Sequence, residues 1–364
     1  MGNRLSRKVS VGRVDIGGGA GVSVQSMSNA DPHDAAAIIA QAEKCERAGC
    51  DIFRLTVPDA EAAKTLGEVK KAVSMPIVAD IHFDWRLALA AIDAGCDALR
   101  LNPGNIGSPE RVRTVASAAS ARGVPIRVGV NLGSLEKDLD ASLRSGRISA
   151  AEALAASAMR HVGILEEADF RDVVISAKAS NVLDTVAAYR LLAEKTDIPL
   201  HVGVTEAGTT IPGAVRSSVA MGILLSEGIG DTVRVSLTAA PEKEVKVALE
   251  ILRSLGLREN GPSVTSCPTC GRTRVPLERV AAETEAALEE LYLREKAQGK
   301  TMSPFPRVAV MGCAVNGPGE AKGADVALCG GNGDFVLFVK GKQVCRVCAD
   351  EAAGKVVEHV ACLR

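Results

Sequence analysis

The sequence predicts an α/β protein in which a (β/α)8, or TIM, barrel is followed by a small α/β domain. Between residues 22 and 238 the chain repeats one unit, a short β-branched run followed by an Ala-rich stretch with helical spacing. Eight such repeats over roughly 240 residues match a closed barrel, and they favour it over a doubly wound sheet. Seven of the ten cysteines follow residue 266, which indicates that a different kind of domain begins near this point.

Each repeat begins with an expected strand and continues into a helix that ends near a glycine. The expected strands span residues 22–27, 51–56, 76–83, 98–104, 125–131, 172–179, 199–206 and 232–238. The Gly-rich stretch at residues 17–21 precedes a strand rather than a helix, so it does not fit a dinucleotide-binding loop. We expect it to be a turn in an N-terminal hairpin that caps the bottom of the barrel.

Composition argues against several classes of partner. The 364-residue chain has a formal net charge of −1 and a pI near 6.6, so no overall field attracts nucleic acid or anionic membranes. One Trp, two Tyr and six Phe are too few for a base-stacking surface. The sequence shows no signal core and no apolar stretch of bilayer length, so we expect a cytoplasmic protein. Cys45, Cys50 and Cys96 fall in apolar contexts and are expected to be buried packing residues.

Seven of the eight expected strands carry polar residues towards their C-terminal ends, where buried parallel strands should be continuously apolar. Within a strand these residues are two or four positions apart, so they point to the same face. The C-terminal mouth is where barrel enzymes place their active sites. The residues concerned are Arg54 and Thr56, Asp80 and His82, Arg100 and Asn102, Arg127 and Asn131, Ser176 and Lys178, Glu206, and Arg234 and Ser236.

The charges of these residues do not balance, which indicates an anionic ligand. Only two obvious carboxylates, Asp80 and Glu206, face the cations. Buried cations need anionic partners, and the planar guanidinium group suits phosphate oxygens. The loop NPGNIGSPE at residues 102–110 adds backbone amides for the same anion, so a diphosphate fits better than a monocarboxylate. Asp80, His82 and Glu206 remain as candidates for proton transfer. The five cations are Arg54, Arg100, Arg127, Lys178 and Arg234.

The polar stretch RENGPS at residues 258–263 is the expected linker between a domain of residues 1–257 and a domain of residues 264–364. The second domain reads as strand, helix, strand, helix, strand, strand and helix. It opens with a CxxC pair, Cys267 and Cys270, that needs further ligands. Spacing alone leaves open a structural zinc site and an iron–sulfur cluster. The Gly/Pro loop after Cys313, where backbone N–H groups can approach sulfide, favours the cluster. Other candidate ligands are Cys329 and the second CxxC pair, Cys345 and Cys348.

Over essentially its whole length the chain resembles the 4-hydroxy-3-methylbut-2-enyl diphosphate synthase family of the non-mevalonate isoprenoid pathway. The motifs are VQSMSN, RLTVP, ADIHFD, LRLNPGNIG, RVGVNLGSLE, ISAKASN, VGVTEAGT, RVSLT, SCPTCGRT and VMGCAVNGPGEA, with Ser28 as a small departure where Thr is usual. The resemblance implies one four-iron, four-sulfur (4Fe-4S) cluster held by Cys267, Cys270, Cys313 and Glu320. It gives no ligand role to Cys329, Cys345 or Cys348, which are expected to be structural.

The resemblance also implies a reaction, the reductive opening and dehydration of 2-C-methyl-D-erythritol 2,4-cyclodiphosphate, with two electrons from a ferredoxin or flavodoxin. Glu206 would protonate the departing hydroxyl group, assisted by Asp80 and His82. The diphosphate would be bound by Arg54, Arg100, Arg127, Lys178, Arg234 and Ser236, with Asn102 and Asn131 beside them. The residues alone also allow a Schiff-base aldolase with Lys178 as nucleophile and an appended zinc module, or a non-enzymatic electron carrier or zinc-dependent interaction module.

Linker length predicts a homodimer. The last barrel helix returns the chain to the bottom of a barrel that is about 30 Å deep. The six linker residues span about 20 Å at most, so the second domain is not expected to reach the mouth of its own barrel. We therefore expect a two-fold, head-to-tail dimer in which the cluster domain of one chain covers the barrel mouth of the other.

Overall fold

The structure, a computed structural model, describes residues 4–258, 261–300, 304–314 and 317–363. The chain divides into two compact units, Met1–Arg258 and Glu259–Arg364. This division falls at the start of the expected linker. Each unit has its own hydrophobic core.

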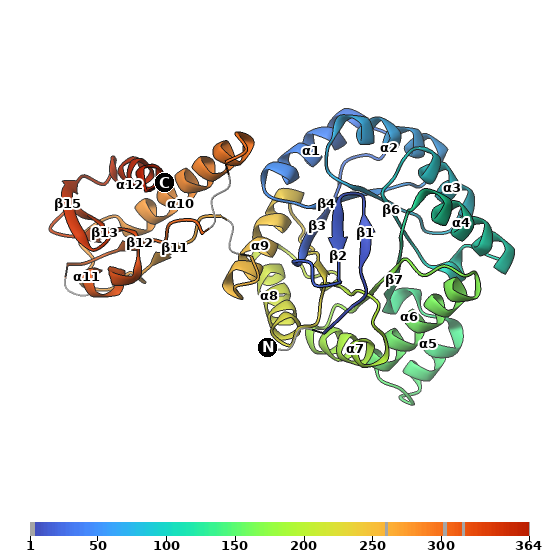
Figure 1. Cartoon of the computed structure of the whole chain (residues 1–364). Helices are drawn as coiled ribbons and strands as arrows, with labels where there is room; N and C mark the ends of the chain where they lie inside the picture. Colours follow the sequence, from blue (N-terminus) through green and yellow to red (C-terminus); the bar gives the residue numbers. More distant parts are fainter. Residues whose placement is uncertain (1–3, 259–260, 301–303, 315–316, 364) are drawn as a thin grey trace. The chain divides into compact units, whose positions relative to one another are not determined.

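The first unit is a parallel barrel of eight strands, which confirms the predicted fold (Figure 1). Its strand order is β8-β7-β6-β5-β4-β3-β10-β9, and a backbone bridge between Ile175 and Leu200 brings β8 and β9 together. The strands are β3 Ser23–Met27, β4 Ile52–Thr56, β5 Ile77–Asp80, β6 Ala98–Leu101, β7 Ile126–Asn131, β8 Val173–Lys178, β9 His201–Val202 and β10 Thr232–Val233.

Helices surround the barrel, and several begin at a side chain that accepts hydrogen bonds from the first turn. Asp34, Asp59 and Asn181 are such N-caps, as is Ser149, which also forms a capping box with Glu152. Small alanines let the helices pack closely on the strands. The elements are α1 Ala35–Arg47, α2 Ala60–Ala72, α3 Trp85–Asp93, η1 Pro103–Asn105, α4 Pro109–Arg122, η2 Leu132–Ser134, α5 Lys137–Arg144, α6 Ala150–Glu167, α7 Val182–Lys195, α8 Thr210–Ser226 and α9 Pro241–Ser254.

Several strands end earlier at the mouth than the sequence predicted. The expected strands 76–83, 98–104, 199–206 and 232–238 were too long, because their last residues belong to loops. Pro103 has no backbone N–H for the ladder and begins η1. Glu206 adopts a φ of 53°, which an extended strand does not allow. His82, Asn102, Glu206 and Ser236 therefore lie in loops after the strands rather than within them.

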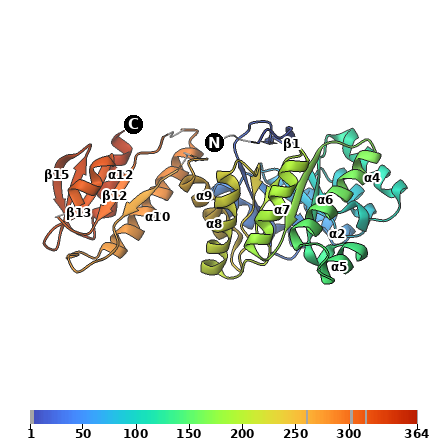
Figure 2. The ribbon, with the colours of Figure 1, turned by 90° about the horizontal axis from the view of Figure 1, so that it is seen from below.

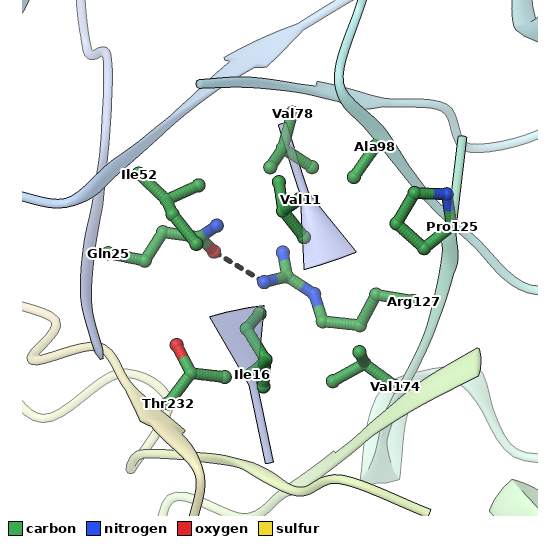
Figure 3. A pocket seen from close by; sticks show the side chains of 10 residues that line it. All are labelled: Val11, Ile16, Gln25, Ile52, Val78, Ala98, Pro125, Arg127, Val174 and Thr232. Carbon is green, nitrogen blue, oxygen red and sulfur yellow. Dashed lines mark hydrogen bonds between the residues drawn. The ribbon is translucent and has the colours of Figure 1, made fainter. Parts of the chain in front are cut away.

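An N-terminal hairpin closes the bottom of the barrel, as predicted, but its turn lies at Gly12 and Arg13. The Gly-rich stretch at residues 17–21, which was expected to form this turn, instead follows the second strand. Strands β1 Val9–Val11 and β2 Val14–Ile16 pair antiparallel and lie at one end of the barrel (Figure 2). Val11 and Ile16 pack against the first apolar layer of the barrel interior, which Ile52, Val78 and Ala98 provide (Figure 3). The interior is thereby sealed from solvent at this end.

The second unit is a five-stranded sheet with helices on both faces. The strands are β11 Val264–Ser266, β12 Val308–Met311, β13 Val326–Gly330, β14 Phe335–Val339 and β15 Lys342–Val347, of which the first three are parallel. The sequence predicted four strands, and the fifth arises because β14 and β15 pair as an antiparallel hairpin. The helices are α10 Leu277–Ala297, α11 Gly317–Glu320, η3 Ala321–Gly323 and α12 Ala352–Cys362.

The two faces of this sheet differ. Helices α10 and α12 bury Val310, Leu328 and Leu337 on one face. On the other face Met311 and Cys329 pack against Ala321 of η3. None of the described helices, in either unit, combines the length and hydrophobicity that crossing a bilayer requires.

We predict that Ile16→Ala lowers the free energy of unfolding of the barrel by about 2–4 kcal/mol, because it leaves a cavity in the apolar seal. Urea denaturation followed by circular dichroism measures this change. Leu5→Ala is the matched control, since Leu5 is 85% exposed whereas Ile16 is 3% exposed. An unchanged midpoint for Ile16→Ala would show that the hairpin does not seal the core.

Candidate active site

Polar side chains of neighbouring barrel strands lie at matching heights because the strands pair in register. Asp80 of β5 pairs with Arg100 of β6, which pairs with Arg127 of β7. Asn131 of β7 pairs with Lys178 of β8. Register partners in a sheet point to the same side. These residues therefore share one side of the barrel wall.

That side is the interior, as a hydrogen bond across the barrel shows. A guanidinium N–H of Arg127 on β7 donates to the side-chain oxygen of Gln25 on β3 (Figure 3). The two strands are separated by β6, β5 and β4, so the bond crosses the enclosed space. Its residues line a cavity of about 20 Å³ above the hairpin, next to Val11 and Ile16. Gln25 was not singled out from the sequence.

Asp80 forms ion pairs with two of the interior arginines and offsets one of their two charges. It is 3% exposed, and its carboxylate lies 3.2 Å from Nη1 of Arg100 and 3.7 Å from Nε of Arg54. Burial would raise the pKa of Asp80, but Arg54 and Arg100 outweigh it and lower the pKa below its ordinary value. Arg100 also donates to the carbonyl of Gly129 at 2.8 Å, and a Cβ at Gly129 would collide with the guanidinium group.

A second buried carboxylate, Glu244 of α9, neutralises Arg234. Glu244 is 4% exposed, and its Oε1 lies 3.3 Å from Nη2 of Arg234. It also accepts hydrogen bonds from the Ser26 hydroxyl and the Leu237 backbone N–H, both at 2.9 Å. Glu244 was not singled out from the sequence, because an acid in the first turn of a helix is usually solvated. Its position on the buried stripe that includes Val245 and Ala248 could have identified it.

Lys178 and His201 lie in the same interior, where neither has a carboxylate partner among the described residues. Among the described residues, Lys178 has no carboxylate oxygen within 4 Å, and desolvation followed by the charges of Arg234, Arg127 and Arg54 lowers its pKa well below the usual value. His201, which is 1% exposed, has neither ring nitrogen hydrogen-bonded to a described group. Burial first, then the same cations, lowers the pKa of His201. Burial and the neighbouring cations therefore favour the neutral form of His201, which was not singled out from the sequence.

The interior therefore carries an excess of positive charge over the described carboxylates. Five interior cations influence one another electrostatically, and their acidic neighbours are Asp80 and Glu244. The five cations are Arg54, Arg100, Arg127, Lys178 and Arg234. The second carboxylate that lies beside these cations among the described residues is Glu244 rather than Glu206. Glu206 is exposed in the loop after β9.

The remaining predicted residues lie in the loops at the mouth or at a strand end. His82 is exposed beside Phe83 and close enough to Asp80 to help lower its pKa. Asn102 is buried, and its Oδ1 accepts a hydrogen bond of 2.9 Å from the Gly129 backbone N–H. Asn131 ends β7, and Ser236 is half-buried after β10. Asn102 thus holds the β6 loop against β7.

In the second unit, two of the predicted cluster ligands follow adjacent parallel strands. Cys267 comes directly after β11, and Cys313 follows β12. The Gly312 backbone N–H donates to the sulfur of Cys267 at 3.1 Å. Cys270 is exposed, and hydrogen bonds from Arg272, first from its backbone, lower the pKa of this thiol.

These thiols fit an iron–sulfur cluster in their chemistry. Three cysteines, a lowered thiol pKa at Cys270 and an amide N–H that donates to sulfur are features of thiolate ligation to iron. No three His, Cys, Asp or Glu side chains among the described residues form a ready-made metal site. The fourth predicted ligand, Glu320, ends α11, and its side chain lies outside the described part of the chain.

The other cysteines that the sequence analysis considered differ in environment. Cys329 is buried near Cys313 and Cys267, and burial raises its pKa to about 11. Cys345 packs against the core under α10 and α12, whereas Cys348 is exposed. In the barrel, the expected packing residues are all buried, namely Cys45, Cys50 and Cys96.

Comparison with known proteins identifies the family. A family model described as the GcpE TIM-barrel domain matches residues 6–249, and another described as the GcpE protein C-terminal domain matches residues 263–362. Together the two matches span both structural units. They confirm the resemblance that the sequence motifs indicated.

Curated relatives align with nearly the whole chain. A protein of Ruminiclostridium cellulolyticum is 50% identical over 355 residues, covering 98% of this chain and 97% of its own. One of Clostridium acetobutylicum is 50% identical and covers 98% of each chain. One of Maridesulfovibrio salexigens is 51% identical and covers 96% and 94%. All three are named 4-hydroxy-3-methylbut-2-en-1-yl diphosphate synthase (flavodoxin). The chain therefore belongs to the GcpE family and is an oxidoreductase enzyme.

Proposed function

We propose that the chain converts 2-C-methyl-D-erythritol 2,4-cyclodiphosphate into 4-hydroxy-3-methylbut-2-enyl diphosphate. The relatives' names support this product. The reaction consumes two electrons and two protons. It breaks the bond between a ring carbon and a phosphate oxygen, and it releases one hydroxyl group as water. The observation that carries the proposal is the uncompensated positive charge inside the barrel, which fits a diphosphate.

The interior cations would bind the diphosphate. Arg54, Arg100 and Arg234 each keep a carboxylate partner, so they offer their remaining N–H groups in fixed directions. Lys178 lacks such a partner among the described residues. Phosphate oxygens beside Lys178 would raise the pKa of its ammonium group again and favour the charged form. The predicted substrate-binding set also includes Arg127, Asn102, Asn131 and Ser236.

Glu206 is the proposed proton donor to the departing hydroxyl group. It stands at the C-terminal end of the barrel in a left-handed backbone conformation, which costs a non-glycine residue about 1–2 kcal/mol. Such strain persists where the surrounding structure requires one particular side-chain direction. Asp80 suits a positioning role better than proton transfer, because its lowered pKa keeps it ionised between Arg54 and Arg100.

Cys267, Cys270 and Cys313, with Glu320 as the fourth ligand, would hold a 4Fe-4S cluster. When bound, such a cluster supplies the two electrons one at a time. The proposed electron donor is a flavodoxin, as in the relatives' names, and a ferredoxin is the alternative. The Gly312 N–H would stabilise negative charge on the Cys267 sulfur.

The head-to-tail homodimer stays a prediction, and we propose it for the active enzyme. Helix α9 ends at Ser254, and β11 begins at Val264. Few residues therefore connect the two units. Each active site would combine the barrel of one chain with the cluster unit of its partner.

We predict that Lys178→Met raises the free energy of unfolding by about 1 kcal/mol or more at neutral pH, because it removes a desolvated positive charge. The folded pKa of Lys178 lies below the unfolded value of about 10.4, so this gain should shrink as the pH rises towards 10.4. Urea denaturation at several pH values measures it.

The same variant should lose affinity for the cyclic diphosphate, as titration calorimetry would show. Lys64→Met on α2 is the control, since Lys64 is exposed. Lower stability combined with unchanged substrate affinity would contradict the proposed role. A lysine with a lowered pKa also suits the Schiff-base alternative, which borohydride trapping at Lys178 would reveal.

We predict that Cys313→Ser loses most of its iron and acid-labile sulfide, whereas Cys348→Ser keeps both, because Cys348 has no proposed ligand role. Iron and sulfide analysis with visible absorption, on protein purified without oxygen, measures the difference. Both variants replace a cysteine of the second unit with serine, so a difference in iron content reflects the position of the cysteine rather than the loss of a thiol. Equal iron in the two variants, or zinc in place of iron, would contradict the ligand assignment.

We predict that Glu206→Gln and Cys313→Ser are each inactive when expressed alone. Co-expression of the two variants should restore about a quarter of the wild-type activity. Half of the dimers are then mixed, and each mixed dimer has one intact site of its two. Glu206→Gln alone should lower kcat by about 100-fold or more. Turnover of the cyclic diphosphate measures both effects. No recovery, with mixed dimers demonstrated by differential tagging, would place each site within one chain.

A further inference from the structure

We propose that an exposed basic cleft on the second unit is the docking surface for an electron-donor protein with an acidic surface. This inference rests on the proposed function, because it names the partner of the cluster site. The basic cleft has a volume of about 460 Å³ and reaches Cys313. Its polar lining consists of Arg272, Arg274, Arg346, Asn332 and Asp334.

Two separate segments bring the arginines of the basic cleft together. Arg272 and Arg274 lie in the loop that follows Cys270. Arg346 lies on the edge strand β15, where it pairs with Val336 of β14. The pairing continues from Val336 through Cys329 to Met311, so Arg346 points to the same sheet face as these residues. This is the face next to the predicted cluster ligands.

The charges of the basic cleft are not neutralised by the described part of the chain. Arg272, Arg274 and Arg346 are exposed, and none has a described carboxylate oxygen within 4 Å. Arginines elsewhere in this unit do have such partners: Arg279 pairs with Asp350 at 2.8 Å and Arg307 with Asp325 at 3.9 Å. The lining thus offers three guanidinium groups against one carboxylate, Asp334.

An acidic protein surface matches this cleft better than the cyclic diphosphate does. Exposed, hydrated arginines add little affinity for a small ligand, but they steer an oppositely charged protein towards its site. Electrons transfer efficiently only over short distances, so a donor must dock beside the ligand cysteines, and Cys313 lines the cleft. The buried cations of the barrel already provide a site for the diphosphate.

The test uses the double variant Arg274→Glu/Arg346→Glu, which leaves Arg272 and its contact with Cys270 unchanged. The holoenzyme is assayed with an acidic flavodoxin and, separately, with dithionite as a small chemical reductant. We expect kcat/KM for flavodoxin to fall by about tenfold or more at low salt, with a weaker salt dependence. Turnover with dithionite, the KM for cyclic diphosphate and the iron content should stay unchanged.

Arg294→Glu is the matched control. Arg294 is exposed on α10, the helix that packs against the opposite face of the sheet. This single substitution changes the net charge by −2, half the change in the double variant, and it should leave both assays unaffected. The single variant Arg346→Glu, which also changes the charge by −2, is compared with it directly, and an equal loss in these two single variants would reflect net charge rather than the basic cleft and would overturn the proposal.

Two other results would also overturn the proposal. One is unchanged flavodoxin kinetics in the double variant. The other is a raised KM for the cyclic diphosphate with both reductants, which would show that the cleft binds substrate. If the unaltered enzyme contains its cluster but does not reduce the cyclic diphosphate with dithionite, the proposed function fails instead. The cleft is then judged by flavodoxin affinity in calorimetry, where a tenfold loss in the double variant supports docking and an unchanged affinity excludes it.

Discussion

The uncompensated positive charge inside the barrel is the constraint on which the rest of this structure depends. Arg54 and Arg100 share Asp80, whereas Lys178 has no described carboxylate within reach. Removing a charge from water costs several kcal/mol, and ion pairing offsets that cost incompletely. The surrounding fold must supply the difference, which it does through the apolar layer under the cations and the hairpin residues, such as Ile16, that seal it.

Sequence periodicity predicted the barrel because each repeat contains enough local information to define a strand and a helix. Sequence periodicity predicted less well where the strands end at the mouth of the barrel. The stretch 199–206 looks like one β-branched strand, yet the ladder covers only His201–Val202, because Gly203, Val204 and Thr205 continue towards Glu206, whose φ is positive. Whether a residue finds a ladder partner depends on the neighbouring strand, and a single strand's sequence does not contain that information.

The candidate site was predictable where it depends on strand parity and unpredictable where it depends on contacts between distant elements. The alternation of side chains along the strands predicted that Asp80 and Arg100 point to the same face. The strand register, which pairs the two residues, agrees with this prediction. Glu244 escaped because it reaches the interior from a helix, and helical periodicity alone does not show what an inward-facing carboxylate meets. His201 escaped because a histidine within an apolar run most often indicates ordinary packing. The proposal that Glu320 is the fourth ligand rests on the family motif, and spacing rules for cysteine sites would not have suggested it.

The two units use positive charge in opposite ways, and physical chemistry explains why. Buried charges are screened little by salt, so the barrel cations would discriminate strongly between the proposed diphosphate and water. Their burial lowers the stability of the ligand-free barrel. The free energy lost by burying Lys178 is recovered when an anion binds, so substrate should stabilise the barrel by mass action. Exposed charges such as Arg346 cost the fold little and act at longer range, which suits brief encounters with a second protein. An enzyme that must hold a small anion firmly and release an electron donor after each transfer benefits from both arrangements.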